Sequence, residues 1–237
     1  LPRKDIVFKK RKNIWERLSL GASQMTGSAR GQLCGQLYCI RAEVARNIYL
    51  PRDLCACDDG FIKALVCTDF LMHQVWPWRI VAAPDAAHTF EAYISPRGIL
   101  KNQKRQMIGQ TIVHVLVDHY LKNLPVTKRM KLANALSEQE QADPNWLKQL
   151  IREHLKRTKF WWQLYPDLLS YGFKRLGGLS WLKRIVCFPA AAAGFFVALV
   201  SSFLAYTSLK SGVTDYWPRA ERNGLKDFDL NRAAGDV

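Results

Sequence analysis

Residues 185–209 read IVCFPAAAAGFFVALVSSFLAYTSL, a run of 25 residues without a charged side chain. At about 1.5 Å per residue, a helix of this length exceeds the ~30 Å hydrocarbon core of a bilayer. Lys183, Arg184 and Lys210 border the run, where long cationic side chains can reach lipid head groups. The alternative, a buried core helix, needs a shell of soluble helices around it. The sequence therefore predicts one transmembrane helix at 185–209, followed by a polar tail at 210–237.

Basic residues on the two sides of this run favour one orientation. Those before the run are Lys174, Arg175, Lys183 and Arg184, and those after it are Lys210, Arg219 and Arg222. Cytoplasmic flanks carry the excess of Lys and Arg. We therefore expect a single-pass membrane protein whose N-terminal part faces the cytoplasm.

The region upstream of the run reads as helical. Ser95-Pro96 supplies a helix cap and a first-turn proline, and apolar residues recur at helical spacing from Ile99 to Leu121. Pro144 starts a further amphipathic helix that extends to about Phe160. Between 160 and 184, aromatic residues and leucines alternate with Lys and Arg, a pattern typical of a segment in the membrane interface. We therefore expect residues 126–184 to form a helical, interfacial segment, although aromatic residues can equally belong to a core.

The front third has a different pattern. Residues 32–40 and 78–83 read as buried strands, and the stretch from Asp58 to His73 between them suits a helix. A strand–helix–strand order predicts a mixed α/β layer over residues 31–125.

The net charge of +15, from 35 Lys and Arg against 20 Asp and Glu, implies acidic partners. Nucleic acid, anionic lipid and phosphorylated substrates are the candidate classes. Six basic residues between Arg3 and Lys12 mark residues 1–30 as a basic lead-in. No groove-reading motif accompanies the charge, so we expect no nucleic-acid partner. The six cysteines form no CxxC pair, which fits reduced thiols facing the cytoplasm.

Few residues have the pattern of a catalytic or binding site. Asp58 and Asp59 at a helix start are either favourable charges near its N-terminus or a general base. Gly35 inside a strand marks either a bulge or the close approach of a ligand. Gln103 and Arg105 belong either to a solvated helix face or to a phosphate site. His114 and Asp118 share a helix face but His119 points elsewhere, so we expect no zinc site.

Taken in order, these motifs resemble family 2 glycosyltransferases, the inverting GT-A enzymes related to cellulose, chitin and hyaluronan synthases. The resemblance covers about residues 30 to 110. The residues that carry it are Gly35-Gln-Leu-Tyr-Cys-Ile-Arg41, Leu50-Pro51, Asp58-Asp59-Gly-Phe61, Arg79-Ile-Val-Ala-Ala-Pro-Asp-Ala86 and Asn102-Gln-Lys-Arg-Gln106. It implies the C-terminal half of a GT-A-like mixed sheet, followed by amphipathic helices and one transmembrane helix.

The resemblance also implies roles for single residues. Asp59 matches the catalytic base and Asp58 the acidic residue before it. Gly35, Gln36, Leu37 and Tyr38 match the acceptor side of the pocket. Gln103 and Arg105 match the helix motif that helps hold the nucleotide diphosphate and the acceptor end. The family's tryptophan after this arginine is Gln106 here, which favours transfer of a single sugar over processive synthesis.

The family's nucleotide-binding half, with its Asp-x-Asp metal motif, does not precede Gly35 in this sequence. We therefore expect either the C-terminal part of a longer enzyme or a relic without donor binding. In the full-length enzyme a divalent metal, Mg or Mn, would neutralise the departing diphosphate, and this chain alone should bind none.

The sequence as a whole predicts a membrane-bound inverting glycosyltransferase. Its expected partners are a nucleotide-sugar donor, a glycan or lipid-linked acceptor, and the membrane. The alternative is a non-enzymatic basic membrane adaptor that binds anionic lipid or a protein.

Overall fold

The computed structural model describes residues 2–5, 33, 35, 37–54, 57–83, 88–91, 95–165, 173, 176–178 and 180–212. The α-helices within these residues are α2 (Ala42–Ala45), α3 (Asp58–Cys67), α4 (Pro96–His114), α5 (Val126–Arg129), α6 (Leu132–Ala142), α7 (Trp146–Arg157) and α8 (Trp181–Lys210). Short 3-10 helices are η1 (Arg52–Leu54), η2 (Pro77–Arg79), η4 (Leu121–Asn123), η5 (Trp161–Leu164) and η7 (Leu176–Gly178), and η3 (Val115–Tyr120) is a π-helix. Two four-residue strands, β1 (Pro2–Asp5) and β2 (His88–Glu91), pair in parallel.

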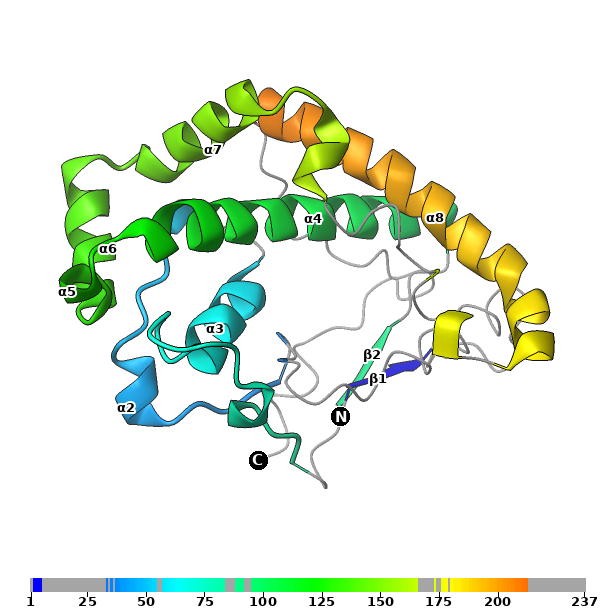
Figure 1. The fold of residues 1–237 in the computed structure, drawn as a ribbon, viewed down its shortest axis with the longest axis horizontal. Coiled ribbons are helices and arrows are strands. Elements are labelled where there is room, and N and C mark those ends of the chain that lie inside the picture. The colour runs from blue at the N-terminus through cyan, green and yellow to red at the C-terminus, as the bar shows by residue number, and fades with distance from the viewer. Residues whose placement is uncertain are drawn as a thin grey trace, which may run out of the picture.

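The predicted α/β fold with a GT-A-like mixed sheet is wrong, because the regular structure of the described residues is almost entirely helical and their sheet is one pair of four-residue strands (Figure 1). The described positions of the predicted strand at 32–40 are not strand, and the predicted strand at 78–83 begins in η2 and continues without regular structure. A strand is stable only where neighbouring strands bond its backbone groups. Among the described residues only β1 and β2 pair in this way, and neither coincides with a predicted strand.

Helix α4 runs through the centre of the molecule (Figure 1). Ser95 caps it, because its Oγ accepts a hydrogen bond from the Gly98 backbone N–H at 3.0 Å, and Pro96 occupies the first turn. The predicted helix from Ser95-Pro96 to Leu121 is thus confirmed, except that its last part is a π-helix. Helices α3 and α8 contact α4, and α7 contacts η3. The core along this axis includes Ile108, Ile112, Val115, Leu116 and Leu121.

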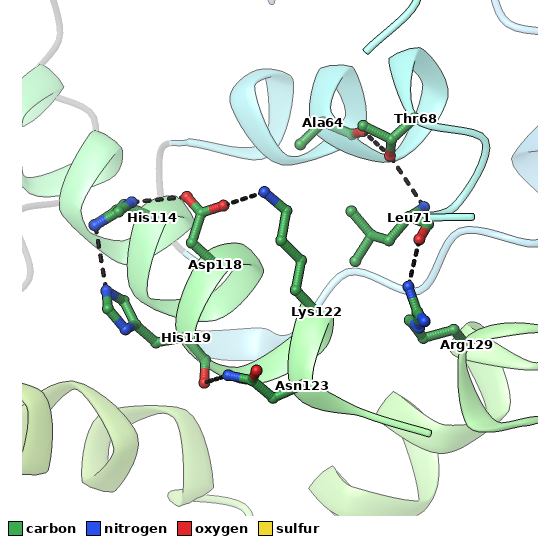
Figure 2. A network of polar contacts seen from close by, with 9 residues as sticks. All are labelled: Ala64, Thr68, Leu71, His114, Asp118, His119, Lys122, Asn123 and Arg129. Atoms are coloured by element: carbon green, nitrogen blue, oxygen red, sulfur yellow. Dashed lines mark hydrogen bonds and ion pairs between the residues drawn. The ribbon is translucent and has the colours of Figure 1, made fainter. Parts of the chain in front are cut away.

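Helix α3 places its apolar face on α4 and ends in an unusual turn. Phe61 and Leu65 are buried in the shared core. After the helix, Asp69, Phe70 and Leu71 have φ values of 50°, 55° and 65°, in the left-handed region that is costly for non-glycine residues. Thr68 Oγ1 accepts from the Leu71 backbone N–H at 3.0 Å, and Arg129 Nη1 donates to the Leu71 carbonyl at 2.6 Å (Figure 2). These bonds from α3 and α5 hold the turn in place.

Helix α8 has two contrasting faces. A stripe of mostly small residues is buried against the body of the protein: Ala198, Ser201, Ser202, Ala205 and Leu209. Phe188, Phe196 and Phe203 are exposed on other faces of the helix. By length and composition, Cys187–Lys210 is the one helix of the described residues that can cross a membrane. The predicted hydrophobic helix at 185–209 is therefore present.

The contact between α3 and α4 depends on Gly109. A Cβ atom added to Gly109 would lie 2.7 Å from Cys57 Cβ, closer than real contacts allow. A helical Gly→Ala change is usually stabilising by about 0.8–1.0 kcal/mol. Here we expect Gly109→Ala to lower the free energy of unfolding by about 1–3 kcal/mol, the usual cost of overpacking. Urea denaturation of the purified protein in detergent measures this.

Gly60→Ala is the matched control, because its Cβ would meet Val113 Cγ2 at an ordinary 3.7 Å. We expect this variant to be neutral or stabilised by up to about 1 kcal/mol. Equal effects of the two substitutions would contradict the close packing of Gly109 on Cys57.

Candidate functional site

The two carboxylates of the candidate site lie in the first turn of α3. Cys57 occupies the N-cap position without a side-chain cap bond, so Asp58 and Asp59 are the first helical residues rather than the cap. Negative charges in this turn interact favourably with the positive end of the helix dipole. Asp59 Oδ1 accepts a hydrogen bond from the Gly60 backbone N–H at 2.7 Å, and both carboxylates are partly exposed. The pair is therefore fixed at a helix start and open to solvent.

Gly35 lies directly against Asp59. A Cβ atom added to Gly35 would be 2.9 Å from Asp59 Oδ2 and 3.2 Å from both Cβ and Cγ of that side chain. Only a residue without a side chain allows this approach without a shift of the carboxylate. Gly35 and Asp59 are 24 residues apart in the sequence, and the resemblance assigns both to one site. In the structure they are in contact.

The segment that leads into α3 is tied to α6 and α7. The Tyr49 hydroxyl donates to the Glu140 carboxylate, whose Oε1 also accepts from the Arg52 backbone N–H at 2.8 Å. The bond to Glu140, with burial, raises the pKa of Tyr49 above its ordinary value. Lys148 Nζ lies 2.9 Å from Oδ1 of the buried Asp53. These contacts fix the position from which α3 begins.

Arg105 lies on α4, the helix that packs against the start of α3 through Gly109. It precedes Gly109 by four residues on α4, so the two share a face, and Gly109 packs on Cys57 next to Asp58. Arg105 Nη2 donates to Asn102 Oδ1 at 3.2 Å. Gln103 is two residues from Arg105, and residues at that spacing do not face each other on a helix. Arg105, rather than Gln103, is therefore the side chain on the Asp58–Asp59 side of α4.

Two further predicted acceptor residues are exposed. Leu37 is 48% exposed and Tyr38 is 37% exposed. Gln36 lies outside the described residues. Of the predicted acceptor residues that the structure describes, Gly35 is the one in contact with the carboxylate pair.

A second polar cluster spans the end of α4 and η3. His114 Nδ1 is 2.7 Å from Asp118 Oδ2, and His119 Nε2 is 3.3 Å from His114 Nε2 (Figure 2). The His119 ring also packs on His154 of α7, with the ring centroids 4.3 Å apart. The expectation that His119 points away from His114 is wrong. In a π-helix the backbone bonds run from i to i+5, which brings residues five apart to the same side.

The charges in this cluster influence one another. Burial alone would raise the pKa of Asp118, but hydrogen bonds from Lys122 and His114 outweigh it, so its pKa lies below the ordinary value. Burial lowers the pKa of His154, and the neighbouring His119 and His114 lower it further. Asp118 is therefore ionised near neutral pH.

No known protein family, curated protein or solved structure matches this chain.

Proposed function

We propose that this chain forms the acceptor side of a membrane-bound inverting glycosyltransferase, which transfers a sugar from a nucleotide sugar to a glycan or lipid-linked acceptor near the membrane. The contact between the Gly35 backbone and the Asp59 carboxylate is the observation that carries the proposal. It joins the two motifs to which the resemblance assigns the acceptor pocket and the catalytic base. Arg105 stands on the adjoining face of α4, where its planar fork suits a diphosphate.

Asp59 is the general base in this proposal. Its carboxylate takes the proton of the acceptor hydroxyl while that oxygen attacks the anomeric carbon of the donor. The bond from this carbon to the diphosphate oxygen breaks, and the nucleoside diphosphate leaves with the bonding electrons. Such a base needs a carboxylate within hydrogen-bond reach of the hydroxyl. Asp59 is partly exposed, so an acceptor hydroxyl can approach its carboxylate from solvent.

The proposal depends on these residues and not on a mixed sheet. A divalent Mg or Mn ion would be expected with a nucleotide-sugar donor, and such ions require several oxygen ligands. Among the described residues no group of three His, Cys, Asp or Glu side chains is arranged to hold a metal ion. The described residues therefore do not fit that ion on their own, and the step assigned to Asp59 is proton transfer alone.

Helix α8 is the membrane anchor of this proposal. Its flanking residues Arg184 and Lys210 are exposed, where they can reach head groups. The excess of basic residues before the helix favours a cytoplasmic position for the part that carries Asp59. A membrane-held site suits an acceptor that is lipid-linked or close to the bilayer.

A second candidate function is a basic membrane adaptor that performs no transfer. The exposed aromatic side chains of α8, together with the net charge of +15, favour this alternative. It would bind vesicles of anionic lipid without turning over a nucleotide sugar.

The transfer of labelled sugar distinguishes these functions. Membranes that carry the natural gene product containing this chain are incubated with a panel of nucleotide sugars, and label in lipid or glycan is counted. We expect Gly35→Ala to lower transfer by about 10–100-fold, because a displacement of the base by a fraction of an ångström to 1 Å is costly. Gly178→Ala is the matched control, since nothing lies within 4 Å of its added Cβ. Lipid binding without transfer from any donor would favour the adaptor.

A further inference from the structure

Three histidines, one each from α4, η3 and α7, lie together. The proposed sugar transfer does not use them. His114 ends α4, His119 lies in the π-helix η3, and His154 lies in α7. The rings of His114 and His119 meet edge to face, with centroids 4.9 Å apart and an interplanar angle of 87°. Figure 2 shows the facing nitrogens of these two rings. Both side chains are accessible, since His114 is partly exposed and His119 is exposed.

The π-helix creates this pair. In a regular helix, residues five apart point in directions about 140° apart, which would separate His119 from His114. The wider turn of η3 places the two rings together. In the following 3-10 helix η4, Asn123 Nδ2 donates to the His119 carbonyl at 2.9 Å. Single π-turns inside long helices occur frequently at functional sites.

The separation of the two nitrogens matches a metal chelate. With metal–nitrogen bonds of about 2.0–2.1 Å and a tetrahedral angle, two imidazole nitrogens on one zinc ion lie roughly 3.3–3.4 Å apart. The Nε2 atoms of His114 and His119 are 3.3 Å apart. We propose that these two atoms bind a divalent transition-metal ion of the zinc class, with water completing its coordination.

Asp118 prepares His114 for this role. Nδ1 of His114 is engaged by Asp118 Oδ2 at 2.7 Å, which leaves Nε2 as the ring nitrogen that faces His119 and the proposed ion. A carboxylate behind a ligating histidine is a recurrent feature of zinc sites. Lys122 bonds the other oxygen of Asp118 and thereby fixes the carboxylate. A metal ion held by both Nε2 atoms would take the place of the hydrogen bond between the two rings.

His154 is a positioning residue in this arrangement. The described ranges contain no metal-binding group of three His, Cys, Asp or Glu side chains, so from these ranges we assign only His114 and His119 as ligands. The His154 ring packs on His119 at an interplanar angle of 47°, and this contact fixes the plane of the second ligand.

Titration of the purified chain with Zn(II) tests the proposal. The protein is held in detergent, and its thiols are first blocked, because free cysteines also bind zinc. Calorimetry measures the affinity, and the visible spectrum with Co(II) reports the coordination geometry. We expect His114→Asn and His119→Asn each to weaken Zn(II) binding by more than about tenfold, and Asp118→Asn by about 10–100-fold.

Two further variants separate metal binding from a mere structural contact. His73→Asn removes a histidine that stacks on Trp76 outside the cluster, and should leave the affinity unchanged. His154→Phe keeps a ring against His119, and should change the affinity less than either ligand variant. Equal Zn(II) affinity in the parent, His114→Asn and His119→Asn proteins would overturn the proposal and leave an N–H···N hydrogen bond between the rings. Failure of sugar transfer would not bear on this result.

Discussion

Replacing Asp59 by asparagine should lower the rate of sugar transfer by about 10²–10⁴-fold, the usual worth of a positioned general base. Asparagine keeps the shape of the side chain, and its Oδ1 can still accept the bond from the Gly60 backbone N–H. It cannot take up the proton of the acceptor hydroxyl. The measurement is turnover of the natural gene product with its nucleotide sugar, together with circular dichroism to show that the fold is retained.

Asp58→Asn is the matched control for this variant. It removes the same charge from the same helical turn. The atoms nearest to an added Cβ on Gly35 all belong to Asp59 and not to Asp58. We expect Asp58→Asn to lower turnover by less than about tenfold, because Asp58 would influence the reaction only through its electrostatic field. If both variants transfer sugar at the parent rate, the carboxylates serve only the helix dipole. The proposed enzyme function would then lose the observation on which it rests.

The helices could be predicted because their signals are local. Ser95-Pro96 marks the start of α4 in the sequence, and the structure places the Ser95 hydroxyl on the Gly98 backbone N–H. The spacing after Pro144 predicts a helix, observed as α7 at Trp146–Arg157. The apolar run at 185–209 predicts a long helix, observed within α8. Each of these patterns involves residues that are close together in the sequence, so it needs no knowledge of distant contacts.

The strands could not be predicted because they depend on distant partners. The runs at 32–40 and 78–83 are short and apolar, and such runs do not determine their own structure. In the described residues neither run has a neighbouring strand, so other contacts decide their conformation. The resemblance implied a sheet for them, and the described structure does not contain it.

The contacts within the candidate sites could not be predicted from the sequence either. The resemblance grouped Gly35 with Asp59, but their contact is visible only in the fold. The pairing of His114 with His119 does not follow from regular helix geometry, in which residues five apart point in different directions. The signal in the sequence is the spacing of five residues between His114 and His119, although nothing near it marks a π-turn.

Placing two aspartates in the middle of α8 should remove the protein from membranes. Phe196 and Val200 lie near the centre of Cys187–Lys210, and their side chains are 62% and 46% exposed. An aspartate at the centre of a spanning helix costs about 2.5–3.5 kcal/mol. Two of them cost about 5–7 kcal/mol, which corresponds to a shift of roughly three to five orders of magnitude in partitioning. Extraction with alkaline carbonate measures this for Phe196→Asp combined with Val200→Asp.

The matched control adds the same two charges at exposed apolar positions outside α8. Val75 is 62% exposed and Val81 is 81% exposed, so Val75→Asp combined with Val81→Asp should leave the protein in the carbonate-resistant fraction. This pair also corrects for any general repulsion of acidic side chains by anionic lipid.

The same experiment separates a spanning helix from one that is docked on the body of the protein. The buried stripe at Ala198, Ser201 and Ala205 fits both arrangements, because small residues also allow close packing of helices inside membranes. A docked helix with its aromatic side chains in water would be extracted by carbonate in the parent protein already, and aspartates on that surface would change nothing. Retention of the parent with release of the α8 variant is therefore the result that requires a bilayer around Phe196 and Val200.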